Sequence, residues 1–138
     1  MSDNSTYCDF SVDFVKNKFT NDLSKVIDRT AIRQSVSNIM LTMKGEKPFN
    51  RNFGCDVHKY LFENIGSGSI ALLTLQRDIG DQLAAWEPRV TLTSVELDES
   101  NMDSNNLGIN VTYIINNMDQ ETGSSFEDSV SVTIAKVR

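Results

Sequence analysis

Three glutamates, Glu46, Glu63 and Glu87, are the residues whose type could support hydrolytic chemistry in this chain. A glycosidase needs two carboxyl groups across a sugar-binding cleft, one of them with a raised pKa. No cluster of aromatic side chains accompanies any of the three as a sugar platform, and Trp86 is better explained as the last core residue of a helix. The sequence also lacks a nucleophile elbow and a glycine-rich phosphate loop. We therefore predict a protein that is not an enzyme and that binds no cofactor or small-molecule substrate.

Cys55 and His58 have the spacing of half a metal site. A structural zinc site needs four ligands with definite spacing, and this pair supplies only two. We therefore expect no metal, with Cys55 as a small buried residue and His58 as an exposed polar residue on a short helix. Cys8 is the second cysteine of the chain. Both thiols are expected to be free, because cytosolic proteins seldom keep disulfides.

Glu87-Pro88-Arg89 places an acid and a base on either side of a proline. Glu87 lies at a predicted helix C-terminus, where the helix dipole disfavours a carboxylate, so something has to compensate its charge. Pro88 biases the preceding residue toward extended backbone, which lets Glu87 and Arg89 project to a common side. Two interpretations remain open. One is an internal salt bridge worth about 0–1 kcal/mol if exposed; the other is a docking pair in which Arg89 grips carboxylate or carbonyl oxygens of a partner.

The stretch from Lys44 to Gly54 predicts a rigid loop between two helices. Glycines that tolerate a positive φ, a stiffening proline and two aromatic anchors are expected to structure it; these residues are Gly45, Pro48, Phe49, Phe53 and Gly54. The two phenylalanines are predicted to insert beneath the loop. Its main purpose is then to build the fold, and the charges that it would present to a neighbour are Glu46, Lys47 and Arg51.

Apolar residues at three- and four-residue spacing predict two longer helices. The first is capped by Asp28, ends at Gly45, and has its apolar stripe at Ile32, Val36, Ile39, Met40 and Met43. The second is capped by Ser69, stops at Pro88, and has its stripe at Leu72, Leu75, Ile79, Leu83 and Trp86. Between them, a short helix over residues 56–63 is expected to bury Val57, Tyr60 and Leu61.

Alternating apolar and polar residues predict strands at both ends of the chain. Residues 8–14 alternate as one half-buried strand, and residues 15–27 are left irregular or partly extended. After Pro88, strands are predicted over residues 90–97, 107–115 and 130–134, with a bulge near Thr93-Ser94 where the apolar parity changes. The prediction is a single α+β domain over residues 1–138: a small antiparallel β-meander (89–138) packed against two to three helices of a mainly helical part (28–88).

The charge of the chain is unevenly divided. Its 138 residues include 13 Lys and Arg against 19 Asp and Glu, and from Val90 to Ala135 there are eight acids and no Lys or Arg. An acidic β half disfavours nucleic acid and favours a basic protein partner, although the acids are explained equally well as solubilising the surface. No apolar run reaches the roughly 18 residues of a membrane span, and the N-terminus lacks a signal-peptide pattern. A cytosolic product without membrane contact is therefore expected.

The string from Lys44 to Asp56, followed further on by Glu87-Pro88-Arg89, resembles the paired signatures of one family. This is the small baseplate wedge protein of contractile phage tails, which starts sheath assembly; the type VI secretion baseplate contains a relative. The similar string runs on through Leu61-Phe62-Glu63-Asn64, and the resemblance covers roughly residues 28–138. Arg51 departs from the pattern, because the family often has a proline there, and this loosens the loop slightly.

The resemblance implies a structural component of the virion, in the tail baseplate, assembled in the host cytoplasm and present in six copies. Its implied partners are other baseplate wedge proteins and the tail sheath protein. Glu87, Pro88 and Arg89, with Glu46 and Lys47, would dock on the helical core bundle of the wedge. The sheet would accept strands of the first sheath ring, with the final strand (130–137) at an edge, unless an N-terminal strand around residues 10–14 caps that edge. The alternatives are a peptidoglycan-cleaving enzyme, because the family is often labelled lysozyme-like, and a type VI secretion baseplate subunit.

Overall fold

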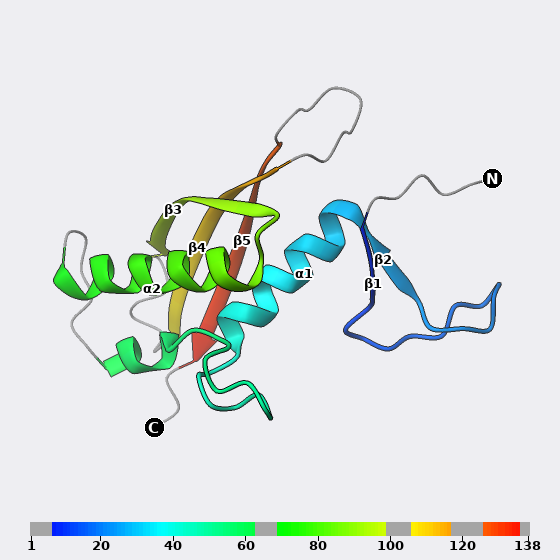
Figure 1. Ribbon diagram of the computed structural model, residues 1–138, viewed down its shortest axis with the longest axis horizontal. Helices are drawn as coiled ribbons and strands as arrows, with labels where there is room; N and C mark the ends of the chain where they lie inside the picture. The colour runs from blue at the N-terminus through cyan, green and yellow to red at the C-terminus, as the bar shows by residue number, and fades with distance from the viewer. Residues whose placement is uncertain (1–6, 63–68, 99–105, 117–125, 136–138) are drawn as a thin grey trace.

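A computed structural model describes residues 7–62, 69–98, 106–116 and 126–135 of the chain (Figure 1). The elements in chain order are β1 (Cys8–Phe10), β2 (Lys25–Ile27), α1 (Asp28–Leu41), the 3-10 helix η1 (Val57–Phe62), α2 (Ile70–Trp86), β3 (Val90–Asp98), β4 (Asn106–Ile115) and β5 (Phe126–Ala135). This is an α+β arrangement, as predicted.

The centre of the fold is the antiparallel sheet β3-β4-β5. Its pairing register shifts between Leu92 and Ser94, which confirms the predicted bulge. Alternate residues of β4 and β5 are buried; the residues between them are mostly half-buried in β4 and exposed in β5, and most are polar. One hydrophobic cluster joins these inward residues to the apolar faces of both helices, with Ile32, Val36, Leu75 and Ile79 fully buried. Both helices therefore cover the same face of the sheet (Figure 1).

Helix α2 forms as the sequence predicts. The Ser69 side chain accepts a hydrogen bond from Leu72 N at 3.2 Å and so caps the helix. Leu75, Ile79 and Leu83 are buried along one face, whereas Trp86 remains 36% exposed. The helix ends at Trp86, because Pro88 cannot continue the ladder of backbone hydrogen bonds.

Helix α1 differs from its prediction at both ends. Asp28 does not cap it: Ile27 is the N-cap residue, and the Asp28 carboxylate accepts a hydrogen bond from Tyr7 N at 3.1 Å. The helix ends at Leu41 instead of Gly45, which leaves Met43 in the loop and 44% exposed. In η1, Val57 is buried as expected, whereas the side chain of Leu61 lies outside the described residues.

The N-terminal segment is a hairpin and not a half-buried strand. β1 pairs antiparallel with β2, and the ladder continues through a bridge between Lys16 and Leu23. Phe10 and Phe14 are 52% and 70% exposed, so the predicted burial of residues 8–14 is wrong. The alternation is real, but no described element covers either face of this hairpin completely. In Figure 1 the hairpin extends from the start of α1 away from the three-stranded sheet.

Candidate functional site

Glu87 and Arg89 form the expected acid–base pair at the junction between α2 and β3. Arg89 donates from Nε and Nη2 to the two carboxylate oxygens of Glu87, each at 2.5 Å. The junction fixes the backbone as well: Glu87 N donates to Leu83 O at 2.8 Å, and Val90 N donates to Glu87 O at 3.1 Å. A bidentate pair on such a backbone is held in one geometry.

The two partners differ in their access to solvent. Glu87 is 2% exposed, and it also accepts a 2.6 Å hydrogen bond from Ser35 Oγ on α1. The Arg89 side chain keeps 33% of its surface, and its guanidinium lies 4.8 Å from the centre of the Tyr7 ring. Arg89 is thus the member of the pair that a partner can reach, while Glu87 and Tyr7 hold it in place.

The electrostatics of Glu87 are those of an ionised structural group. Burial alone would raise its pKa, but the hydrogen bonds from Arg89 and Ser35 outweigh burial, so the pKa lies below its ordinary value. A glycosidase acid needs the opposite shift. Glu46 is exposed and accepts from Met43 N at 3.0 Å, and Glu63 lies outside the described residues. Glu87 therefore lacks the raised pKa that a general acid needs.

The loop from Thr42 to Cys55 closes on itself at Gly54. Cys55 N donates to both Ile39 O and Thr42 O, at 3.2 and 2.9 Å, which brings the end of the loop back to the end of α1. Gly54 has φ +102°, and a Cβ atom there would lie 2.2 Å from Thr42 O. Gly45 has φ +90° with open space around it. Both glycines therefore adopt the backbone region that the sequence predicted.

The two phenylalanines of the loop lie in different environments. Phe53 packs edge-on against Trp86 with ring centres 5.5 Å apart, and Lys47 Nζ lies 4.0 Å from the Phe53 ring centre. Phe49 has φ +64° and a fully exposed side chain, so its predicted insertion beneath the loop is wrong. The contact between Phe53 and Trp86 joins the loop to the Glu87-Pro88-Arg89 junction, since Trp86 directly precedes Glu87.

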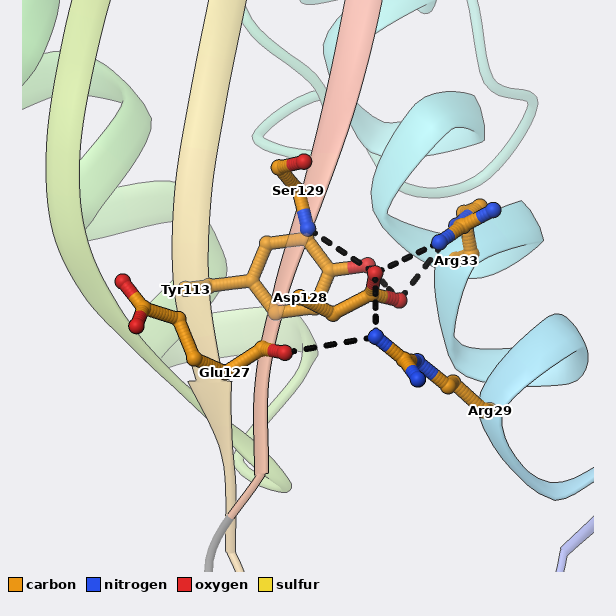
Figure 2. Close-up of polar contacts among 6 residues, drawn as sticks. All are labelled: Arg29, Arg33, Tyr113, Glu127, Asp128 and Ser129. Atoms are coloured by element: carbon orange, nitrogen blue, oxygen red, sulfur yellow. Dashed lines mark hydrogen bonds and ion pairs between the residues drawn. The ribbon is translucent and has the colours of Figure 1, made fainter.

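A buried ionic cluster around Asp128 was missed by the sequence reasoning (Figure 2). Asp128 on β5 is 5% exposed, and it accepts hydrogen bonds from Arg29 Nη2 at 3.1 Å and Arg33 Nη2 at 2.5 Å, both on α1. Tyr113 Oη and Ser129 N also donate to it, at 3.3 and 2.9 Å. The signal was present, because Asp128 has the same parity in β5 as the buried Val130, Val132 and Ile134.

This cluster changes the interpretation of the eight acids between Val90 and Ala135. Burial alone would raise the pKa of Asp128, but the hydrogen bonds from Arg33 and Arg29 outweigh burial and lower the pKa to about 2. Asp128 is therefore ionised but neutralised, and it is no part of an acidic surface. Among the other seven acids, Glu96 and Glu127 are exposed; Glu99, Asp103, Asp119 and Glu121 lie outside the described residues.

The two edges of the three-stranded sheet are unequal. The β3 edge carries the bulge, and Gln76 Nε2 on α2 donates to Val95 O there at 2.9 Å. On β5, Arg29 binds Glu127 O at 3.3 Å and the Asp128 carboxylate binds Ser129 N, so the first part of that edge is also occupied. By strand parity, the next backbone N–H and C=O groups that point outward are those of Ser131 and Thr133. These groups hydrogen-bond to no other described residue. The N-terminal strand pairs with β2 and does not cap this edge.

The part of the chain that is described holds no group of three or more His, Cys, Asp or Glu able to bind a metal ion. Cys55 is buried, and burial raises the pKa of its thiol to about 12. His58 is partly buried in η1 and not exposed as predicted. Within the same described ranges, no helix has the length and apolar character needed to cross a membrane.

Comparison with known proteins gives one consistent family. The family model for baseplate wedge protein gp25 matches residues 27–120. Baseplate wedge protein gp25 of Enterobacteria phage T4 is 31% identical over 94 residues, which cover 68% of this chain and 69% of the relative.

Two solved structures share the fold. A suggested tail lysozyme from Geobacter sulfurreducens has a TM-score of 0.58 at 24% identity, covering 78% of this chain and 91% of the other. A chain of the sixfold-symmetrised baseplate of the anti-feeding prophage has a TM-score of 0.60 at 17% identity, covering 96% and 87%. That match leaves 4% of the 138 residues, about six, without a counterpart, so it includes most of the N-terminal hairpin.

Proposed function

Because the chain belongs to the family of baseplate wedge protein gp25, we propose that it is a structural adaptor of a contractile tail. One side of it docks on the core bundle of the baseplate wedge, and the other accepts the first ring of sheath subunits. Its partners are then other baseplate wedge proteins and the sheath protein, and it is present in six copies in the tail baseplate of a virion assembled in the host cytoplasm.

The observation that carries the docking half is the geometry of Arg89. Its side chain is one-third exposed, yet both of its bonds to Glu87 and its contact with Tyr7 restrict it to one position. A guanidinium fixed in this way loses little conformational freedom on binding a carboxylate or a helix C-terminus. Glu87 serves as the internal support of Arg89, because its own burial keeps it from touching a partner.

The exposed loop supplies a second contact for the same partner. Phe49, Glu46 and Lys47 are exposed on it, and its packing on Trp86 links it to the Arg89 junction. Phe49 holds a backbone conformation that non-glycine residues seldom adopt, with its aromatic ring in solvent. Exposed aromatic residues and arginine are the residue types that dominate binding energy at protein interfaces. We assign Phe49 to this interface in place of its predicted role as an anchor.

The sheath half of the proposal rests on the open end of the β5 edge. The outward backbone groups of Ser131 and Thr133 are available for pairing in the described part of the chain, and an added strand gains affinity from such groups. The β3 edge is less suitable, since its bulge and Gln76 interrupt it. We therefore assign the sheath strand to β5.

The proposed role is not enzymatic. The buried Glu87 has a lowered pKa and a fixed arginine partner, which suits structural support and not proton donation. The alternative is a lysozyme, because one solved structure that shares the fold is that of a suggested tail lysozyme. A peptidoglycan turbidity assay on the wild type and on Glu46→Gln, Glu63→Gln and Glu87→Gln distinguishes an enzyme from a structural protein. Lysis that any of these variants abolishes would favour the enzyme.

The docking role is tested by binding to a wedge complex assembled without this chain. Arg89→Ala alone would leave Glu87 buried without its cation, a change that destabilises by about 3–5 kcal/mol. The informative variant is therefore the double change Glu87→Gln with Arg89→Met, and Glu87→Gln alone is its matched control because it keeps Arg89. We expect the double variant to lose binding and the control to keep most of it, because the amide oxygen at position 87 can still accept a hydrogen bond from Arg89; circular dichroism confirms that both are folded. Equal binding by the two would remove Arg89 from the interface.

The sheath role is tested by nucleation of purified sheath protein on the reconstituted baseplate. Ser131→Pro removes one outward N–H group without touching the ladder to β4, and Ser131→Ala keeps that group. We expect the proline variant to delay or abolish sheath growth and the alanine variant to behave as wild type. Normal growth on the proline variant would exclude this part of β5 as the accepting edge.

A further inference from the structure

The hairpin formed by residues 7–27 exposes an unusual amount of apolar surface. Of the fourteen large hydrophobic residues that the described chain exposes, seven lie in this hairpin: Phe10, Val12, Phe14, Val15, Phe19, Leu23 and Ile27. Phe19 at its tip is 97% exposed. Apolar residues gathered in this way on a projecting element are typical of a surface that another molecule covers.

One face of the hairpin combines three of these apolar residues, Phe10, Leu23 and Ile27, with positive charge. Directly opposite residues of an antiparallel pair share a face, and the pairs are Cys8 with Ile27, Phe10 with Lys25, and Lys16 with Leu23. We call these six residues the basic-apolar face. These six residues include two lysines and no carboxylate, and the acid that lines the adjoining cavity is Asp22. Tyr7 and Asp9 have the other parity, and Tyr7 contacts Arg89.

The basic-apolar face is also hollowed. A cavity of about 500 Å³ is lined by Cys8, Leu23, Lys25 and Ile27 from this face, and by Asn17, Thr20 and Asp22 from the tip of the hairpin. This volume lies within the range of roughly 300–1,000 Å³ that is typical of ligand pockets. It therefore has room for several side chains of a bound segment.

The backbone of the hairpin offers one open edge beside this cavity. The bonds from Asp28 N to Tyr7 O and from Ser11 N to Ser24 O lie inside the hairpin, so Phe10, Lys25 and Ile27 direct their backbone groups outward. On the β1 side, the Gln34 amide donates to Phe10 O and accepts from Val12 N, which closes that edge. On the β2 side, the outward N–H and C=O of Lys25 and the N–H of Ile27 bond to none of the described residues, whereas the Ile27 C=O belongs to the N-cap of α1.

We propose that the basic-apolar face is the docking site of an extended, acidic and apolar segment of another baseplate protein, which pairs with β2 as an added strand. The open edge favours a polypeptide, because a lipid surface has no use for aligned backbone donors and acceptors. The lysines favour carboxylates between the apolar residues of that segment. This inference rests on the proposed place of the chain in a baseplate. It adds a contact that lies almost entirely outside the region matched by the family model.

The test measures binding to the wedge complex assembled without this chain, by biolayer interferometry. Leu23→Ser with Ile27→Ser removes apolar contacts, and Lys25→Glu reverses one charge on the face. Arg77→Glu is the matched control, because Arg77 lies on α2 with its side chain 85% exposed and the same reversal there leaves the hairpin intact. We expect at least tenfold weaker binding for both hairpin variants, wild-type binding for the control, and an unchanged unfolding midpoint for all three.

Each other result has a definite meaning. Hairpin variants that bind as wild type, while the Glu87→Gln and Arg89→Met double variant fails, would overturn this inference and leave the docking role of Arg89 standing. If Lys25→Glu weakens binding no more than Arg77→Glu, the acidic character of the partner is wrong. Self-association of the wild type in sedimentation, lost in the hairpin variants, would make the occupant a second copy. Hairpin-dependent binding to anionic lipid vesicles would make it a membrane. A wild type that binds no wedge complex would contradict the proposed function itself.

Discussion

Replacing Asp128 by asparagine is expected to destabilise the fold by removing one buried charge while keeping its shape. The carboxylate receives hydrogen bonds from Arg29, Arg33, Tyr113 and Ser129 (Figure 2). Asparagine retains an oxygen for some of these donors but loses the attraction to two cations. The arginines stay solvated in the variant, since their side chains are 52% and 51% exposed. The loss of stability therefore comes from the missing charge of Asp128, and not from arginines left buried without a partner.

The pKa of Asp128 sets the size of the effect. It falls from an ordinary 3.8 to about 2 in the folded protein, and each pKa unit corresponds to about 1.4 kcal/mol. The ionised carboxylate therefore contributes about 2 kcal/mol above pH 4, and this contribution disappears as the pH falls through 2. For a domain of this size, that is a fall in Tm of roughly 6–10 °C at pH 7.

Urea unfolding of wild type and Asp128→Asn between pH 7 and pH 2.5 checks the reasoning. We expect a constant difference in the free energy of unfolding down to about pH 4.5, and then a steady decrease. Asp81→Asn is the control: Asp81 is 72% exposed and meets Arg77 at 3.9 Å, so its loss is expected to change stability by less than about 0.5 kcal/mol. A difference for Asp128→Asn that is absent at pH 7, or that does not change with pH, would refute the ionic explanation.

Three further outcomes follow from the loop and the cysteines. Gly54→Ala is expected to destabilise by at least about 2 kcal/mol, because its Cβ meets Thr42 O, whereas Gly45→Ala is expected to cost about 1 kcal/mol for its positive φ alone; urea unfolding compares them. Phe53→Ala is expected to lower the free energy of unfolding by about 2 kcal/mol, because it removes the packing of Phe53 on Trp86. Phe49→Ala is expected to lower it by less than about 0.5 kcal/mol, because Phe49 is fully exposed. Equal losses of stability would contradict the assignment of Phe49 to an interface. A thiol reagent at pH 8 is expected to modify Cys8 at once and Cys55 only after unfolding, since Cys8 is exposed and burial raises the Cys55 pKa to about 12.

The elements that the sequence predicted well are those in which local pattern and tertiary packing agree. Helix α2 has a serine cap and a proline stop that act as expected, and Leu75, Ile79 and Leu83 of its apolar stripe are buried; the prediction of Trp86 as a core residue is wrong, because its side chain is exposed. The bulge between Leu92 and Ser94 was predictable because a change of parity in a strand has few other causes. The pairing of Glu87 with Arg89 followed from the geometry of the intervening proline.

The residues that were predicted wrongly depend on what lies nearby in space, which spacing does not encode. Phe49 and Phe53 look equivalent in sequence, but only Phe53 meets Trp86 from a distant helix. Residues 8–14 alternate like a half-buried strand, and nothing in the pattern says that their apolar side stays open to solvent. Asp128 was counted with the surface acids because its cations lie nearly a hundred residues earlier, on α1.

Helix α1 connects the two proposed interfaces, and its polar side chains bind residues at both of them. Ser35 on α1 binds Glu87 and so supports Arg89, whereas Arg29 and Arg33 on the same helix bind Asp128 beside the β5 edge. Residues 29 and 35 are six apart, so the two contacts are about 9 Å apart along the helix axis. A short helix therefore joins the arginine that we propose to dock on the wedge to the strand that we propose to receive the sheath. In this proposal, force applied to β5 would reach Arg89, in the turn between α2 and β3, through bonded side chains of this helix.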